Sequence, residues 1–131
     1  MTTKPIRVVL VDDSRVFLDA IQSCLAEWAG VEIAACAESG AAGLNLIRRT
    51  RPDLVLMDVF MSNMNGLEAS RLIERSAGLP KVMLMTSVDI PGLCAAAVDA
   101  RADAFVLKQH LYSELAQHLE LWFSPAAGRT T

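Results

Sequence analysis

The chain has 131 residues, of which 53% are hydrophobic and 21% are charged. A chain of this length buries roughly 65 to 70% of the surface that its unfolded form exposes, so we expect one domain with its own core rather than two. Twelve basic and fifteen acidic residues give a net charge of −3. This balance disfavours direct binding of nucleic acid, because a small nucleic-acid-binding domain needs a basic surface.

The cysteines and the N-terminal residues indicate a reducing compartment. Cys24, Cys36 and Cys94 are far apart and surrounded by apolar residues, which is not the pattern of a disulfide framework or a zinc site. The sequence contains no run approaching the roughly 18 apolar residues of a membrane span, and no apolar segment of a signal peptide at its start. We therefore expect a cytoplasmic protein without a membrane partner.

Five short apolar runs alternate with segments of helical periodicity, and this alternation predicts an α/β fold. The predicted strands span residues 6–11, 31–37, 54–57, 81–85 and 104–107. The first, third and fourth runs are apolar along nearly their whole length. Such strands are buried on both faces, as in a parallel sheet that helices cover on its two sides.

The spacing of apolar residues between these runs predicts five helices. The first follows Ser14, a candidate N-cap, and its predicted buried face consists of Val16, Phe17, Ala20, Ile21, Cys24, Leu25 and Trp28. The next three are predicted over residues 41–50, 67–76 and 93–100, and the last carries an apolar stripe of Leu111, Leu115, Leu119 and Trp122. The second ends before Pro52, because a proline disfavours helical geometry in the residue ahead of it.

The two ends of the chain lack this periodicity. We expect a tail over residues 1–5, one domain over residues 6–123 and a flexible tail over residues 124–131. The second tail is either a native terminus or the start of a linker to another domain. The short length favours a chain without a DNA-binding or catalytic output domain, whose output passes through a protein contact.

Polar residues stand where four of the predicted strands end. Asp12 and Asp13 follow the first strand, Asp58 the third, Thr86 the fourth and Lys108 the fifth. The ligand crevice of an open α/β sheet lies beyond these carboxyl ends. A single aspartate there is usually a turn former or a helix cap. Three converging carboxylates, however, repel one another unless a cation neutralises them.

The residue types at these strand ends predict phosphoryl transfer to a carboxylate. Hard carboxylate oxygens without a histidine or cysteine nearby favour Mg²⁺, which shares its remaining positions with water and phosphate. Lys108 offers a positive charge, and Thr86 a hydroxyl group, to phosphoryl oxygens. Asp58 is the best nucleophile because it stands alone after a central buried strand, whereas Asp12 and Asp13 are adjacent and better placed to hold the metal.

These residues carry a resemblance to a known family, the receiver domain of two-component response regulators, over nearly the whole chain. The matching residues are Asp12, Asp13, residues 58–66 (DVFMSNMNG), Thr86 and Lys108. Residues 37–40 (AESG) look most like receivers that precede a helix-turn-helix output domain. The resemblance implies a flavodoxin-like receiver fold, a three-layer, doubly wound, five-stranded parallel sheet with strand order 2-1-3-4-5.

The resemblance also implies a function for the acidic residues. Asp58 would accept a phosphoryl group from a histidine kinase or a phosphotransfer protein, so the chain would be a phosphoacceptor and not an enzyme. Asp13, Asp58 and the backbone carbonyl of Phe60 would hold Mg²⁺, with Asp12 helping through water. Together with Thr86 and Lys108, Asp58 would form the reacting centre.

Thr86 and Phe105 match the switch pair of the family. Their movement would reshape the face of the fourth helix, fifth strand and fifth helix, where a downstream protein effector or a second copy of the chain would bind. An ordinary packed ring is an equally good interpretation of Phe105.

Three residues depart from the family pattern. Ser62 and Gln109 stand where proline is usual, and Arg101 stands where glycine is usual. Without the proline at position 109, we expect a freer backbone at Lys108 and a less secure salt bridge from Lys108 to Asp58. We expect Arg101 to alter the turn after the fourth helix, because a side chain disfavours left-handed geometry.

Phe60 and Val88 lie two residues beyond Asp58 and Thr86, at positions that border the path of the hydrolytic water in this family. Our hypothesis is that these two apolar side chains exclude that water and prolong the phosphorylated state.

Three alternatives remain at this point. One is a receiver-like interaction module that never accepts phosphate, which the departures at Arg101 and Gln109 keep open. Another is the receiver part of a longer DNA-binding response regulator. A small Mg²⁺-dependent phosphohydrolase is less favoured, because the haloacid type needs Asp-x-Asp where this chain has Asp12-Asp13-Ser14.

Overall fold

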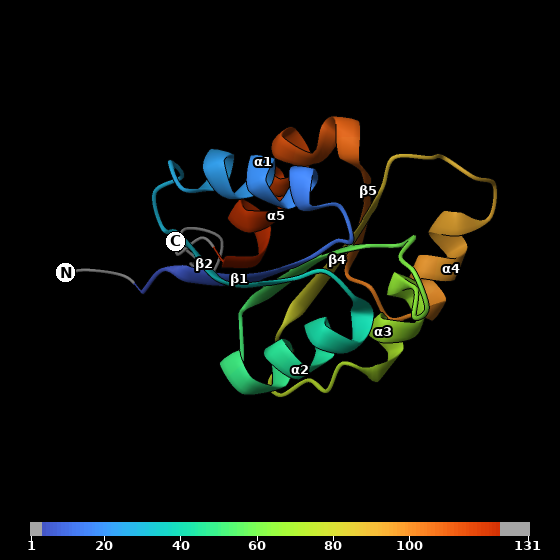
Figure 1. Ribbon diagram of the computed structural model, residues 1–131. Helices are drawn as coiled ribbons and strands as arrows, with labels where there is room; N and C mark the ends of the chain where they lie inside the picture. Colours follow the sequence, from blue (N-terminus) through green and yellow to red (C-terminus); the bar gives the residue numbers. More distant parts are fainter. Residues whose placement is uncertain (1–3, 124–131) are drawn as a thin grey trace.

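The computed structural model describes residues 4–123 as three layers, with helices on both faces of one sheet (Figure 1). The strands are β1 (Ile6–Val11), β2 (Val31–Ala37), β3 (Leu54–Asp58), β4 (Lys81–Thr86) and β5 (Ala104–Leu107). Neighbouring strands are parallel, in the order β2-β1-β3-β4-β5. The predicted doubly wound sheet and its strand order are confirmed.

Five helices and one short 3-10 helix connect and cover the strands. They are α1 (Arg15–Leu25), α2 (Gly40–Thr50), α3 (Gly66–Leu72), α4 (Leu93–Asp99), the 3-10 helix η1 (Lys108–His110) and α5 (Leu111–Phe123). Helices α1 and α5 cover one face of the sheet, and α2, α3 and α4 cover the other (Figure 1). None of the helices in the described part of the chain has the length and apolar character to cross a membrane.

The predicted tails fall largely outside the described residues. Residues 1–3 of the first predicted tail, and the whole of the second at residues 124–131, are not among the residues that the structure describes.

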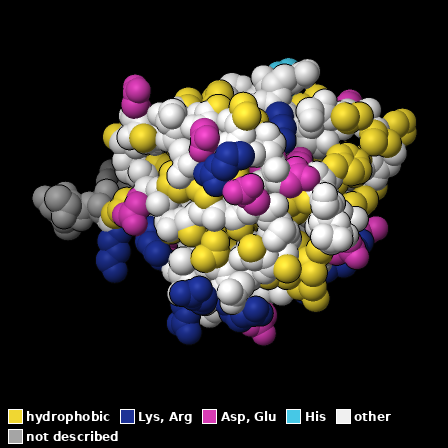
Figure 2. Space-filling view, viewed as in Figure 1, with side chains coloured by type: hydrophobic (Ala, Val, Ile, Leu, Met, Phe, Trp, Pro, Cys, Tyr) yellow, Lys and Arg dark blue, Asp and Glu magenta, His cyan; other side chains and the backbone are white. Residues whose placement is uncertain are grey.

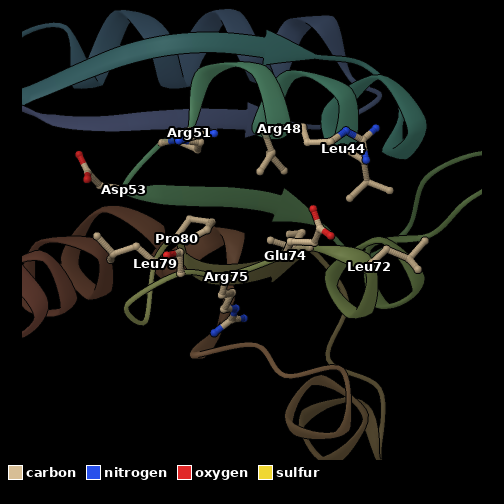
Figure 3. Close-up of a pocket in the computed structure, with 13 residues that line it drawn as sticks. Leu44, Arg48, Arg51, Asp53, Leu72, Glu74, Arg75, Leu79 and Pro80 are labelled. Carbon is tan, nitrogen blue, oxygen red and sulfur yellow. The ribbon is translucent and has the colours of Figure 1, made fainter.

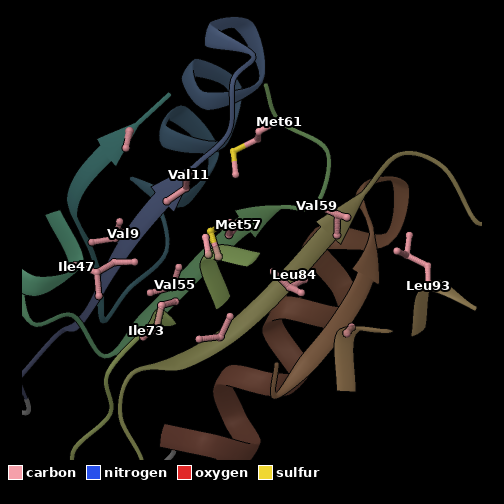
Figure 4. Packing of buried hydrophobic residues seen from close by; sticks show 14 residues of the cluster. Val9, Val11, Ile47, Val55, Met57, Val59, Met61, Ile73, Leu84 and Leu93 are labelled. Atoms are coloured by element: carbon pink, nitrogen blue, oxygen red, sulfur yellow. The ribbon is translucent and has the colours of Figure 1, made fainter. Parts of the chain in front are cut away.

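The central strands divide their side chains between two apolar clusters. Successive residues of a strand point to opposite faces of the sheet, so Val9 and Val11 of β1 face α2 while Val8 and Leu10 face α1 and α5. Figure 4 shows the first cluster, in which strand side chains meet Ile47 of α2. Burial of both faces explains why the central strands are continuously apolar.

The buried face of α1 differs from the predicted one. Ser14 is its N-cap as predicted, since the Ser14 hydroxyl accepts a hydrogen bond from Phe17 N at 3.2 Å. The fully buried residues are Leu18, Ile21 and Leu25, whereas Val16 is 80% exposed. The predicted face was too wide: at about 100° per residue, position 16 lies on the far side of the helix from position 21.

Helix α3 is shorter than the predicted segment of residues 67–76. It ends at Leu72, and Ile73 is extended with φ −73° and ψ 122° and buries its side chain. The next residues make a tight turn, closed by hydrogen bonds between Ser76 and Leu79, with left-handed geometry at Ala77 and Gly78. The chain must reverse here to enter β4, so the helix stops before the periodicity does.

The expectation that Arg101 alters the turn after α4 is wrong. Arg101 takes the left-handed geometry itself, with φ 65°. The turn is held by hydrogen bonds from Arg101 N to Val98 O at 2.9 Å and from Ala102 N to Ala97 O at 3.0 Å. The guanidinium of Arg75 also donates to the carbonyl oxygen of Arg101. These contacts offset the steric cost that a non-glycine residue has in this region.

Candidate functional site

The polar residues at the strand ends meet in one cavity of about 470 Å³ at the carboxyl edge of the sheet. All of the residues proposed from the sequence line this cavity except Phe105. Its floor is acidic, because one carboxylate oxygen each from Asp12, Asp13 and Asp58 lie within 4.8 Å of one another. Strands β1 and β3 are neighbours in the sheet, so their carboxyl ends bring together aspartates that are far apart in the sequence.

Asp12 is held by the backbone at one oxygen and faces Lys108 with the other. Its Oδ1 atom accepts a hydrogen bond from Ser14 N at 2.8 Å, which fixes the carboxylate at the start of α1. Its Oδ2 atom is buried and accepts no hydrogen bond from the described residues, although Lys108 Nζ lies 2.7 Å away as an ion-pair partner. A buried carboxylate oxygen that meets a single ammonium group keeps a lone pair for a hard cation.

Asp58 lies at the end of a strand in which every residue is buried. The pKa of the Asp58 carboxyl is raised from 3.8 to about 6, mainly by burial and also by the negative charges of Asp12 and Asp13, while Lys108 opposes the shift. The ionised form of Asp58 is therefore disfavoured in the folded chain, and a cation in the cavity would stabilise it.

Lys108 reaches the carboxylates from the other side of the cavity. Its Nζ atom lies 2.7 Å from Asp12 Oδ2 and 3.6 Å from Asp58 Oδ1. The salt bridge to Asp58 that the change at Gln109 placed in doubt is present, although the contact with Asp12 is closer. The backbone at this point is held by η1, since Leu111 N donates to Lys108 O.

The loop after β3 approaches the carboxylates closely. Gly66 N donates to Val59 O at 2.7 Å, and a Cβ atom at position 66 would collide with the carbonyl oxygen of Asp58. Glycine is therefore required where α3 begins. Asn65 and Glu68 form a capping box that fixes the start of this helix, with hydrogen bonds of 2.9 and 3.1 Å between side chain and backbone.

The two residues of the predicted switch pair occupy different surroundings. Thr86 is 1% exposed at the end of β4, and its hydroxyl accepts a hydrogen bond from Val88 N at 3.2 Å. Phe105 does not line the cavity; its half-buried ring packs against the apolar cluster beneath α3 and α4. The structure brings Thr86, but not Phe105, to the carboxylates.

Exposed apolar side chains form one side of the cavity. Phe60, Val88 and Ile90 are 47%, 51% and 43% exposed and all line it. Figure 2 shows acidic side chains beside a group of hydrophobic ones over the loop between β4 and α4. Ile90 was missed from the sequence, because a lone isoleucine in a loop gives no signal of its place in the fold.

Sequence reasoning also missed the contact of Phe17 with the site. Phe17 was assigned only to the apolar face of the first helix, yet its ring centroid lies 3.9 Å from Lys108 Nζ. Phe17 belongs to α1 and Lys108 begins η1, so the apolar periodicity of one helix cannot reveal this contact.

A second cavity of about 480 Å³ lies between α2 and the chain that follows α3 (Figure 3). Two of its charged side chains, Asp53 and Arg75, serve the fold. Asp53 Oδ2 accepts a hydrogen bond from Arg7 N at 2.9 Å, and Arg75 forms an ion pair with Asp103 at 3.0 Å. The carboxylate cavity is therefore the better candidate for a functional site.

A doubly wound sheet with an acidic cluster at its carboxyl edge is the architecture of signal-receiving α/β domains. The family described as the response regulator receiver domain matches residues 8–120. The chain belongs to this family.

Known proteins of this family resemble the chain along most of its length. It is 34% identical over 119 residues to the response regulator GacA of Pseudomonas viridiflava, covering 91% of this chain and 56% of that protein. It is 31% identical to the transcriptional regulatory protein LiaR of Bacillus subtilis, covering 85% of this chain and 53% of that protein. The chain thus spans about half the length of the curated relatives it matches.

Solved structures show the same fold. The signal receiver domain of the response regulator NarL from Mycobacterium tuberculosis superposes with a TM-score of 0.81 and 30% identity, covering 97% of this chain and 100% of that one. A LuxR-family two-component response regulator from Aurantimonas also gives a TM-score of 0.81, with 26% identity, covering 95% of this chain and 93% of that one.

Proposed function

We propose that the chain receives a phosphoryl group on Asp58 from a histidine kinase or a phosphotransfer protein in the cytoplasm, and passes the signal on through a protein contact. The observation that carries this proposal is the placement of Asp58. Its carboxylate is buried at the end of β3, within 4.8 Å of two other carboxylates and 3.6 Å from an ammonium group. Such a site concentrates the charges that phosphoryl transfer needs.

The donor atoms in the cavity fit Mg²⁺. Asp12, Asp13 and Asp58 offer hard oxygen ligands, and the buried Oδ2 of Asp12 lacks a hydrogen bond from the described residues. We propose that Asp13, Asp58 and the backbone carbonyl of Phe60 hold the ion, with Asp12 helping through water. When bound, Mg²⁺ neutralises the charge on the oxygens of the transferring phosphoryl group.

The transfer itself requires no general base on this chain. An oxygen of the Asp58 carboxylate forms the new O–P bond while the P–N bond to the donor imidazole breaks, and the electron pair of that bond stays on the imidazole nitrogen. Lys108 binds a phosphoryl oxygen with its ammonium group. The Thr86 hydroxyl accepts from Val88 N, so its own proton is free to bond a phosphoryl oxygen.

The output proposed for this reaction is a change on the face of α4, β5 and α5. Thr86 would turn toward the phosphoryl group, and the ring of Phe105 would move inward. Val98 on α4 and Leu121 on α5 are each 68% exposed, which supports an apolar contact for a downstream protein or a second copy of the chain.

Phosphorylation by a small donor tests the proposal. Incubation with acetyl phosphate and Mg²⁺, followed by intact mass measurement, should add one phosphoryl group to the wild-type chain and none to Asp58→Asn. The matched control is Asp99→Asn, which changes an exposed aspartate at the end of α4 and should be phosphorylated like the wild type.

Two outcomes would contradict the proposal. A chain that gains no phosphoryl group under any condition would favour an interaction module that does not use phosphate. Turnover of generic phosphate esters that depends on Asp58 would instead favour a phosphohydrolase.

A further inference from the structure

The ammonium group of Lys108 has a third partner besides the two carboxylates. The centroid of the Phe17 ring lies 3.9 Å from Lys108 Nζ, well within the range in which a cation is attracted to an aromatic face. The Lys108 side chain is only 15% exposed. Because water screens this attraction poorly in such a place, the contact is of the strong, desolvated kind.

The Phe17 ring is tied to the carboxylates through the first turn of α1. Asp12 Oδ1 accepts from Ser14 N at 2.8 Å, and Ser14 Oγ accepts from Phe17 N at 3.2 Å. The half-buried ring also packs against the apolar cluster beneath α1 and α5. Its position relative to Asp12 is therefore set by the backbone and the core.

The three contacts of Lys108 differ in whether they use carboxylate oxygens of the site. In the ion pairs with Asp12 and Asp58, at 2.7 and 3.6 Å, the ammonium lies against carboxylate oxygens that the proposed function needs for Mg²⁺ and for the phosphoryl group. The contact with Phe17 uses no carboxylate oxygen. The ring can hold the ammonium in the cavity when those oxygens are engaged.

We propose that Phe17 is a positioning residue, whose aromatic face holds the Lys108 ammonium in the cavity where it meets the phosphoryl group. This inference rests on the proposed function of Asp58. The ring contact would also hold Lys108 from α1. Such a hold matters in this chain, because Gln109 replaces the usual proline that would stiffen the backbone next to Lys108. The alternative is that Phe17 only fills space beneath α1.

A graded change of the ring face separates the two roles. Mono-, di- and trifluorophenylalanine at position 17 weaken the attraction of the ring for a cation while nearly keeping its size. We expect the rate of phosphorylation by acetyl phosphate to fall stepwise along the series, by roughly fivefold to tenfold at its end. The same series at Phe123, at the end of α5, is the control and should leave the rate unchanged.

Conventional variants extend the test. Phe17→Leu should slow phosphorylation about as much as the trifluorinated ring does. Phe17→Tyr should keep the wild-type rate because it keeps an aromatic face. A small donor makes these rates independent of any partner that touches α1. Rates that do not change along the fluorinated series, whatever Phe17→Leu does, would overturn the proposal.

A measurement without phosphate distinguishes failure of this inference from failure of the proposed function. The chain has three lysines, Lys4, Lys81 and Lys108, so its lysine side chains can be resolved by NMR with ¹³C-labelled lysine. The Cε protons of Lys108 should show an upfield ring-current shift that is lost in Phe17→Leu and kept in Phe17→Tyr. Absence of this shift in the wild type would overturn the contact, whether or not Asp58 accepts phosphate.

Discussion

Aspartates lie at both ends of the sheet, but the two groups differ in how well the chain satisfies their carboxylates. At the amino end, Asp53 Oδ2 accepts from Arg7 N at 2.9 Å, and Asp103 Oδ2 accepts from Val82 N at 2.8 Å. These carboxylates join neighbouring strands. At the carboxyl end, Asp12 and Asp58 are buried with their charges close together, and one oxygen of Asp12 accepts no hydrogen bond from the described residues.

The difference separates a structural carboxylate from a functional one. Asp103 has its hydrogen bond from the backbone and an ion pair with Arg75 at 3.0 Å, so folding has already satisfied it. Asp58 has neighbours that repel it and only a 3.6 Å contact with Lys108. At the carboxyl end of the sheet, folding leaves carboxylate charge that a ligand from outside the chain can neutralise.

The largest effect should come from the backbone at the carboxyl end. A Cβ atom at position 66 would meet the carbonyl oxygen of Asp58, so Gly66→Ala should lower the free energy of unfolding by about 3 kcal/mol. Urea unfolding measures this loss. Ser62→Ala, an exposed change in the same loop, should cost little. Equal stability of the two variants would show that the loop does not hold Asp58 as described.

At the amino end, removal of a satisfied carboxylate should be the next most costly change. Asp103→Ala leaves Arg75 and Val82 N without their partner, so the free energy of unfolding should fall by about 2 kcal/mol. Asp19→Ala is the matched control, because its ion pair with Arg15 is exposed, and it should cost less than about 0.5 kcal/mol. A loss for Asp19→Ala as large as that for Asp103→Ala would contradict this distinction.

At the carboxyl end, removal of a charge should stabilise the fold. The pKa of Asp58 is about 6 in the folded chain against an ordinary 3.8, so the folded state holds its proton more tightly than the unfolded state. The free energy of unfolding of the wild type should therefore fall as the pH rises from about 4 to about 6. With EDTA present, Asp58→Asn should be more stable than the wild type above pH 6, by on the order of 1 kcal/mol, and no more stable near pH 4.

Unfolding curves across this pH range, with and without Mg²⁺, measure the difference. Mg²⁺ should stabilise the wild type and not Asp58→Asn, because it binds the folded carboxylates. If Asp58→Asn is less stable than the wild type at every pH without metal, Asp58 is a structural carboxylate like Asp103.

The smallest effect concerns the apolar side of the cavity. Phe60 is 47% exposed beside the carboxylates, and Phe60→Asn should admit water and speed loss of the phosphoryl group by roughly threefold. The decay of the phosphorylated chain after removal of the donor gives the rate. An unchanged rate would remove the role proposed for Phe60 and Val88.

The sequence predicted the elements whose signal is local. The strands are apolar runs, of which the central three are mostly buried, and Asp12, Asp58, Thr86 and Lys108 were found because each follows such a run. The topology then brings these ends together, so the assembly of the site followed from strand position alone.

The remaining features depend on contacts between distant segments. Arg101 keeps its left-handed turn partly because Arg75, 26 residues earlier, donates to its carbonyl oxygen. The apolar spacing predicts Val16 on the buried face of α1, but the stripe that is buried is centred on Ile21. Phe17 and Lys108 meet only because α1 packs beside the end of β5. No local pattern contains these contacts.

The most direct test of the account is to locate the phosphoryl group among the aspartates. The chain phosphorylated by acetyl phosphate with Mg²⁺ can be trapped with hydroxylamine, digested and sequenced by mass spectrometry. We predict modification of Asp58 and of no aspartate at the amino end of the sheet. Modification of Asp53 or Asp103 to a similar extent, or of Asp58 equally well in EDTA, would contradict the account.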